Sequence, residues 1–94
     1  MKKGYTYILT NKNKTVLYVG ATTKLKNRVE LHIKGKGTQF TKKYNINELI
    51  YFEVFDDYHD AFARENQIKN WKRKWKLNLI KSQNPNLKNL YLEL

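Results

Sequence analysis

The chain has 94 residues, with 19 lysines and arginines against eight aspartates and glutamates, and its formal net charge is +11 at pH 7. A hydrophobic content of 40% and an aromatic content of 14% exclude a disordered charged tail and indicate one folded domain. The absence of cysteine excludes disulfides and thiolate metal sites. The tyrosine-rich start is too short and polar for a signal peptide, and no later run could span a bilayer, so we expect a cytoplasmic protein without a membrane partner.

The basic charge favours a polyanionic partner such as nucleic acid, although a solvated, lysine-rich surface would give the same composition. Five of the eight acidic residues fall within a stretch of thirteen: Glu53, Asp56, Asp57, Asp60 and Glu65. The rest of the chain is therefore still more basic and faces one carboxylate-rich region.

Residues 4–10 and 15–19 alternate in the manner of strands, with a loop predicted at 11–14. A four-residue hairpin loop would place Tyr7 opposite Tyr18 on one face of the sheet. A slip of one residue would separate the two rings. Ordinary sheet packing with both hydroxyl groups in water would also explain this pair.

A helix is expected after Gly20, which we expect to end the second strand, with Thr22 or Thr23 as the N-cap. Its buried stripe is predicted to contain three residues at four-residue spacing: Leu25, Val29 and Ile33. The sequence "GKG" at 35–37 should end this helix, and a short helical turn is predicted at 38–44.

Arg28 and His32 lie beside that stripe, four residues apart on one edge of the helix. They form either an exposed, solvated edge or a phosphate clamp with a proton carrier or a second phosphate contact.

The apolar run at 49–55 predicts a central strand that is covered on both faces. The helix that follows should have Asp57 as its N-cap and Asp60 in its first turn, and it should end near Asn70. Its apolar stripe is predicted to contain Tyr58, Ala61, Phe62 and Ile68. A last helix over roughly 71–82 would carry Trp71, Trp75 and Leu79 at four-residue spacing, and "NP" at 84–85 would close it.

These elements predict an α+β domain with a three-stranded antiparallel sheet flanked by helices, in the order β-β-α-(short α)-β-α-α. We expect one domain over residues 1–94, with a core at about 4–82 and a C-terminal tail at 83–94.

Glu65 falls inside the apolar stripe of its helix, where a carboxylate costs free energy of desolvation unless it is paired, hydrogen-bonded or bound to a metal. A buried ion pair with Arg28 or Arg64 would explain it, as would a helix rotation that brings Glu65 to solvent.

The run "KNWKRKWK" at 69–76 places cations between two tryptophans, as in surfaces that bind nucleic acid through phosphates and base stacking. Its candidate contacts are Lys69, Lys72 and Arg73. The tryptophans could equally lie in the core with the lysines facing solvent.

The order of these residues resembles the GIY-YIG nuclease domain over about residues 4–82. The resemblance rests on Tyr7, "YVG" at 18–20, Arg28, His32 and the distant Glu65 in "ARE", and it extends to "TKKYN" and "FDDYHDAFARENQIK". The chain is most similar to the small single-domain bacterial branch, related to the nuclease of the excision-repair incision subunit and to structure-selective endonucleases.

The resemblance implies a metal-dependent endonuclease that hydrolyses DNA, with a role in repair or recombination. Its catalytic positions fall on Tyr7, Tyr18, Arg28, His32 and Glu65. Glu65 would hold one Mg²⁺ or Mn²⁺ ion, Arg28 would stabilise charge in the transition state, and Tyr7 would be the general base. Tyr18 would position the water or a phosphate oxygen, and His32 would either share the base role or contact the scissile phosphate.

The sequence departs from the family pattern at several places. Tyr5 and Thr6 stand where the first motif has glycine and isoleucine. Ala21 stands where some members have lysine, so that a phosphate contact is either missing or supplied by Lys24, with Lys26 as a further candidate contact.

A different class of function stays open, in which the same fold is a nucleic-acid-binding module without catalysis. A protein-interaction domain that uses exposed aromatic residues is a third possibility. DNA is favoured over RNA as the partner, and a protein partner or a homodimer would supply specificity.

Overall fold

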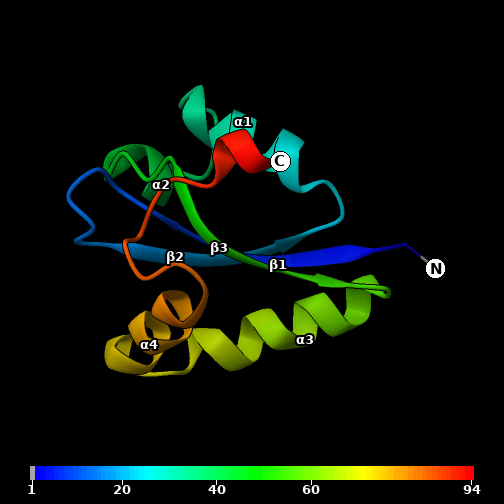
Figure 1. The fold of residues 1–94 in the computed structure, drawn as a ribbon. Coiled ribbons are helices and arrows are strands. Elements are labelled where there is room, and N and C mark those ends of the chain that lie inside the picture. The colour runs from blue at the N-terminus through cyan, green and yellow to red at the C-terminus, as the bar shows by residue number, and fades with distance from the viewer. Residues whose placement is uncertain (1) are drawn as a thin grey trace.

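The computed structural model describes residues 2–94 and contains a three-stranded antiparallel sheet with helices on both of its faces (Figure 1). Strand β1 (Gly4–Thr10) lies between β2 (Leu17–Thr22) and β3 (Glu48–Phe55). The predicted α+β class and the antiparallel sheet of three strands are confirmed.

The prediction that residues 49–55 form the central strand was wrong, because β3 lies at an edge of the sheet. Helices lie on both faces of the sheet, so the first half of this edge strand, Leu49 to Tyr51, is buried as a central strand would be. Part of its outer edge is also bonded, since the Leu90 N–H donates to the Leu49 carbonyl oxygen at 2.7 Å.

Helices α1 (Leu25–Ile33) and α2 (Gln39–Lys43) lie on one face of the sheet, and α3 (Tyr58–Lys69) and α4 (Arg73–Gln83) lie on the other (Figure 1). Each face has its own buried cluster. The α1 face holds Tyr7, Leu9, Leu25, Val29, Ile46 and Leu49. The α3 face holds Ile8, Val19, Ile50, Tyr51, Ile68 and Ile80.

The β1–β2 hairpin pairs Tyr7 with Gly20 and Leu9 with Tyr18, so the predicted pairing of Tyr7 with Tyr18 was wrong. The connection is longer than expected, and Asn11 Oδ1 holds it by accepting hydrogen bonds from the N–H groups of Thr15 at 2.8 Å and Val16 at 3.2 Å. The error in register is two residues, which leaves every side chain on its predicted face. Tyr7 and Tyr18 therefore share a face but lie diagonally across the hairpin.

Helix α1 begins without a side-chain cap at Lys24, which corrects the prediction of Thr22 or Thr23 as N-cap. The Thr22 hydroxyl instead accepts from the N–H of Lys24 itself at 3.1 Å, two residues along the chain, and so bonds no N–H group of the first helical turn. The prediction that Ile33 belongs to the buried stripe of α1 was wrong, because Ile33 is exposed. His32 is buried instead, because Thr41 of α2 packs against its ring.

Helix α3 has the predicted caps, since Asp57 accepts from the His59 N–H at 3.0 Å and Asn70 is the C-cap. Its stripe is narrower than predicted because Phe62 is 50% exposed. Helix α4 begins at Arg73 rather than 71 and buries Ile80, whereas Trp75 is 55% exposed. Within residues 2–94, no helix combines the length and the apolar character needed to cross a bilayer.

The segment after α4, which includes the 3₁₀ turn η1 (Tyr91–Glu93), packs back onto the domain. The buried Asn84 side chain donates hydrogen bonds to the carbonyl oxygens of Ile50 at 3.0 Å and Lys88 at 2.8 Å. The Tyr91 hydroxyl donates to Glu30 of α1 at 2.7 Å. This segment thereby links the outer strand β3 to α1.

Replacing Asn84 should therefore destabilise the fold. We expect Asn84→Ala to lower the free energy of unfolding by about 1–3 kcal/mol, because it leaves buried backbone groups without partners. Thermal or urea denaturation measures the change. Asn78→Ala, at an exposed position of α4, is the matched control, and an equal loss in both variants would contradict the assignment.

Candidate active site

Tyr7 lies in the central strand, and only 1% of its surface is exposed. A Cβ atom at its partner Gly20 would lie 2.5 Å from both Cζ and the hydroxyl oxygen of Tyr7. The phenol therefore lies directly over Gly20, at the edge strand β2. The prediction that Gly20 ends the second strand was wrong, because β2 continues to Thr22. Glycine is needed at this position because the Tyr7 phenol approaches it so closely.

Charged groups surround the Tyr7 phenol. Burial raises the pKa of Tyr7 above its ordinary value, and the neighbouring Tyr18 and Glu65 raise this pKa further. The positive charge of Arg28 opposes these effects and lowers the pKa. Tyr7 therefore keeps its proton at neutral pH in the free protein, and a role as general base would require additional positive charge near the hydroxyl.

His32 is buried, with 4% of its surface exposed, so it does not belong to a solvated helix edge. Its Nδ1 atom lies 3.1 Å from the Thr41 hydroxyl oxygen, and its ring lies 5.8 Å from the Tyr18 ring, centroid to centroid. Burial lowers the pKa of His32, and the Arg28 charge lowers it further, which favours a neutral imidazole. Arg28 itself is exposed, as a residue that meets a phosphate should be.

Glu65 is buried on α3, with 8% of its surface exposed, and its ion partner is Lys69, one turn along the same helix. The predicted ion pair with Arg64 was wrong, because Arg64 Nε donates to Glu53 Oε1 at 3.0 Å and its guanidinium lies over the Trp71 ring. Within residues 2–94, Glu65 forms no ion pair with Arg28, and its burial also rules out the predicted rotation toward solvent.

The predicted catalytic residues approach the β2 edge from both sides of the sheet. Tyr7, Tyr18, Arg28 and His32 lie on the α1 face, and Glu65 comes from α3, which packs against β1 and β2 on the opposite face. Glu65 nevertheless lies close enough to Tyr7 for its charge to act on the phenol. The structure thus gathers all five residues around one edge strand.

The donor set around Glu65 suits only one kind of metal site. No group of three histidine, cysteine, aspartate or glutamate side chains that could hold a metal occurs in the described part of the chain. A single carboxylate does not form a closed cage, but Mg²⁺ is often held by one or two carboxylates together with phosphates of the substrate. Glu65 fits that mode of binding, provided that the Lys69 side chain moves away.

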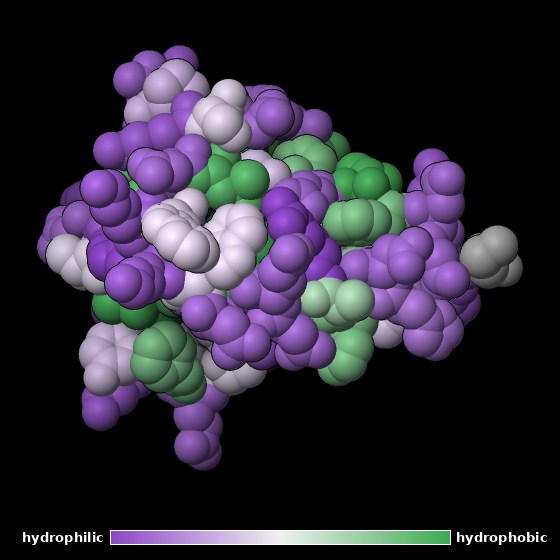
Figure 2. Space-filling model, turned by 90° about the horizontal axis from the view of Figure 1, so that it is seen from below, coloured by the Kyte–Doolittle hydropathy of each residue, from purple (hydrophilic) through white to green (hydrophobic). Residues whose placement is uncertain are grey.

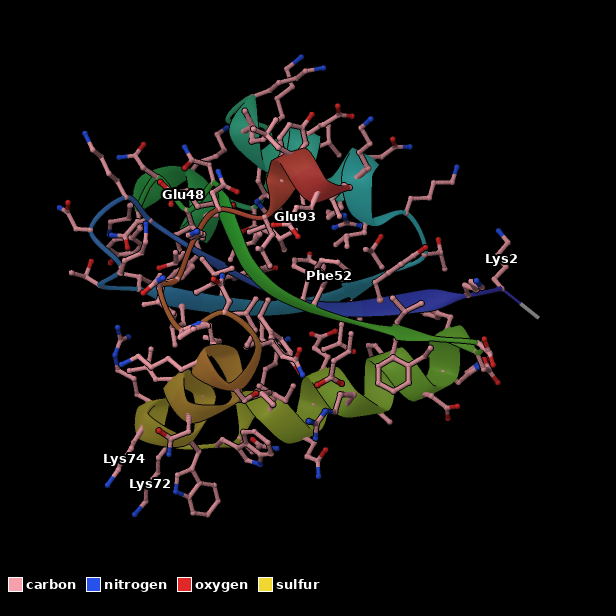
Figure 3. The ribbon with its side chains drawn as sticks, in the orientation of Figure 1. Lys2, Glu48, Phe52, Lys72, Lys74 and Glu93 are labelled. Atoms are coloured by element: carbon pink, nitrogen blue, oxygen red, sulfur yellow. The ribbon has the colours of Figure 1, made fainter. Side chains whose placement is uncertain are left out.

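The five predicted nucleic-acid contacts fall into separate groups. Lys24 and Lys26 line a hollow at the start of α1. Lys69 forms an ion pair with Glu65, one of the five predicted catalytic residues. Lys72, at the start of α4 on the other side of the sheet, points away from it, while Arg73 donates to the Lys14 carbonyl oxygen at 3.0 Å (Figure 3).

The α3–α4 face is mostly hydrophilic, with smaller apolar areas between the polar side chains (Figure 2). Trp75 is exposed on α4 and meets the half-buried Trp71 edge to face, with ring centroids 6.2 Å apart. The alternative that placed both tryptophans in the core is therefore wrong for Trp75.

Sequence reasoning missed Thr41 and Gly37, which hold His32. Thr41 is buried, and a Cβ atom at Gly37 would lie 2.3 Å from His32 Nδ1. No spacing rule relates these two residues to His32, because Gly37 lies in the loop after α1 and Thr41 lies in α2. A polar threonine on the inner side of so short a helix was the one available signal.

The chain is similar to known proteins over most of its length. Residues 3–78 match the GIY-YIG catalytic domain. A UPF0213 protein of Pediococcus pentosaceus is 44% identical over 92% of this chain and 90% of its own length, and one of Staphylococcus haemolyticus is 37% identical over 88% and 100%. The solution NMR structure of a UPF0213 protein from Bacillus halodurans superposes with a TM-score of 0.59 at 28% identity, covering 93% of this chain and 92% of that one.

Proposed function

The chain belongs to the GIY-YIG catalytic domain family, and from this premise we propose that it is an endonuclease that hydrolyses phosphodiester bonds in DNA with one divalent cation. The family supports nuclease-type activity and a nucleic-acid substrate in general. We further propose that the substrate is DNA, that the cation is Mg²⁺ or Mn²⁺, and that the protein acts in repair or recombination. The observation that carries it is that the buried Glu65 carboxylate and the Arg28 guanidinium both lie near enough to the buried Tyr7 phenol for their charges to act on its pKa.

In this proposal Glu65 holds Mg²⁺ or Mn²⁺, which would supply positive charge to the phosphate and to the leaving 3′-oxygen. Lys69 must release the Glu65 carboxylate first. Its side chain is half exposed, so it can turn into solvent when the cation takes its place at the carboxylate.

The protein's own side chains would bind and orient the phosphate. Arg28 is exposed and carries a planar guanidinium, which can bind two phosphate oxygens and stabilise the charge that develops on them. Tyr7, protonated at neutral pH, would donate a hydrogen bond toward the reacting group, and it becomes a base only if positive charge lowers its pKa. Tyr18 would orient the attacking water or a phosphate oxygen.

A second candidate is a nucleic-acid-binding module without turnover. The raised pKa of Tyr7 favours it, since a phenol that keeps its proton is a poor base, and so does Ala21 in the place of a family lysine. This module would bind nucleic acid in a salt-sensitive manner without cleaving it.

A cleavage screen tests the two functions. Labelled flap, bubble, single-stranded and duplex DNA, and RNA of the same sequence, are incubated with Mg²⁺, Mn²⁺ or a chelator. We expect cation-dependent products from DNA and a loss of about a hundredfold in Arg28→Ala, because a guanidinium that stabilises the transition state is removed.

Lys34→Ala, which removes an exposed cation just after α1, is the matched control and should cleave normally. Cleavage that survives Arg28→Ala would contradict the proposed site. Salt-sensitive binding without cleavage on any substrate would favour the binding module. A cytoplasmic location, and a partner protein or second copy that supplies specificity, belong to the same proposal.

A further inference from the structure

His32 has two ring nitrogens in different surroundings. Nδ1 lies 3.1 Å from the Thr41 hydroxyl oxygen. Nε2 is buried and has no hydrogen-bond partner within residues 2–94. Buried polar atoms are nearly always paired, so an unpartnered ring nitrogen inside a candidate active site requires an explanation.

The hydrogen bonds of Thr41 determine which nitrogen carries the proton. The Thr41 hydroxyl donates to the Thr38 carbonyl oxygen at 3.0 Å, and its oxygen lies 3.2 Å from the donating Thr38 hydroxyl. A hydroxyl has one proton, so toward His32 the Thr41 oxygen can only accept. This arrangement favours Nδ1 as the N–H of the neutral ring and leaves the free lone pair on Nε2.

The surroundings hold the ring in this orientation. A Cβ atom at Gly37 would lie 2.3 Å from His32 Nδ1 and 2.6 Å from the Thr41 hydroxyl oxygen, so the loop closes tightly over this hydrogen bond. Thr38 caps α2 by accepting from the Thr41 N–H at 3.1 Å, which fixes the turn that carries Thr41. Tyr18 lies beside the ring. A ring flip would therefore require several groups to move together.

We propose that Thr41 is a positioning residue, which fixes His32 as the Nδ1–H tautomer so that Nε2 accepts a proton from the attacking water. The inference rests on the proposed hydrolytic function. Such hydrogen bonds often form only in the complex with substrate. Tyr18 is half-buried and its ring lies beside the imidazole, so we expect its side chain to shift when water reaches Nε2.

In the proposed step a proton of the water moves to His32 while the phosphodiester bond breaks. One O–H bond of the water breaks and its proton moves to Nε2, while the water oxygen forms a bond to phosphorus. The bond between phosphorus and the leaving 3′-oxygen breaks, and this oxygen takes a proton from solvent. His32 later returns its proton to solvent, which restores the neutral ring.

The nitrogen-15 shifts of the imidazole test the tautomer independently of activity. In the wild type we expect a protonated Nδ1 and an unprotonated Nε2 on His32, with the exposed His59 as an internal reference. A protonated Nε2 in the wild type would overturn the inference. The expected tautomer in a protein that cleaves no substrate would leave the positioning by Thr41 in place and refute the proposed function instead.

Thr41→Val removes the hydroxyl at nearly constant volume. We expect mixed tautomers and a kcat lower by about ten- to a hundredfold, with a KM close to that of the wild type, because proton transfer is affected and substrate binding is not. Thr41→Ser keeps the hydroxyl and should restore both the tautomer and kcat. A wild-type tautomer and kcat in Thr41→Val would contradict the proposal, and if that variant does not fold, the wild-type spectrum still decides the tautomer.

Discussion

Glu65→Gln should lower the rate of DNA cleavage by about a hundredfold or more while leaving DNA binding nearly unchanged. Glutamine has almost the same shape but lacks the charge with which a carboxylate holds a hard cation. Binding should persist because the lysines and arginines that meet phosphates are untouched. Cleavage rates at saturating Mg²⁺ and binding in chelator measure the two effects separately.

The same substitution should leave the folded state as stable as before, or more stable. A buried carboxylate costs desolvation free energy, and within residues 2–94 its ion partner is Lys69, whose ammonium group is half exposed and therefore screened by water. Thermal denaturation measures this, and activity and stability should therefore change in different directions. Such a pattern is typical of a charge kept for function rather than for folding.

Asp60→Asn is the matched control, because it removes the same charge from the same helix at an exposed position. It should keep full activity and lose at most about 1 kcal/mol of stability, since Asp60 interacts favourably with the positive end of the helix dipole. A Glu65→Gln variant that cleaves as fast as Asp60→Asn would remove Glu65 from the mechanism.

Local features of the fold were predictable because they depend on neighbouring residues. The strand at 4–10 follows from alternation, and the α3 caps at Asp57 and Asn70 follow from side chains that bond the nearest backbone groups. The hairpin register was not predictable, because a shift of two residues leaves each face unchanged. The hydrophobic pattern cannot detect such a shift, whereas the bonds that Asn11 makes within the loop belong to the longer connection of the observed register.

The candidate site was also predictable only in part. The identities of its five residues came from their order in the sequence, but their surroundings depend on contacts between distant segments. His32 is buried because the α2 segment covers it, which the periodicity of α1 does not reveal. The partner of Glu65 also differs from the prediction, because Arg64 is already bound to Glu53 of β3. Long-range pairing of this kind is beyond single-sequence reasoning.

Gly20→Ala should be as damaging to activity as the loss of a catalytic side chain, although it adds a single methyl group. The new Cβ would lie 2.5 Å from the Tyr7 hydroxyl and from Cζ, a separation that real Cβ atoms essentially never show. The Tyr7 ring is fully buried and must move to make room. A displacement of about 1 Å at a reacting group can reduce catalysis about a hundredfold, and overpacking costs about 1–3 kcal/mol of stability.

Gly35→Asn is a suitable control, because Gly35 has a φ of 72° with no atom within 4 Å of a Cβ there, and asparagine tolerates this backbone conformation. It should leave cleavage intact. Both variants are assayed well below their melting temperatures, so that a loss of activity in Gly20→Ala reflects a displaced phenol in a folded protein.

A double-mutant cycle with Tyr7→Leu separates displacement from general damage to β2. Leucine is shorter than tyrosine and leaves space for the methyl group, so Gly20→Ala should cost less stability in the Tyr7→Leu background than in the wild type. Activity should stay low in the double variant because the phenol is gone. Strictly additive stability losses would contradict the contact. The φ of Gly20 is not positive, so backbone conformation does not require glycine there. A coupling would establish that glycine is required because the Tyr7 hydroxyl lies where its side chain would be.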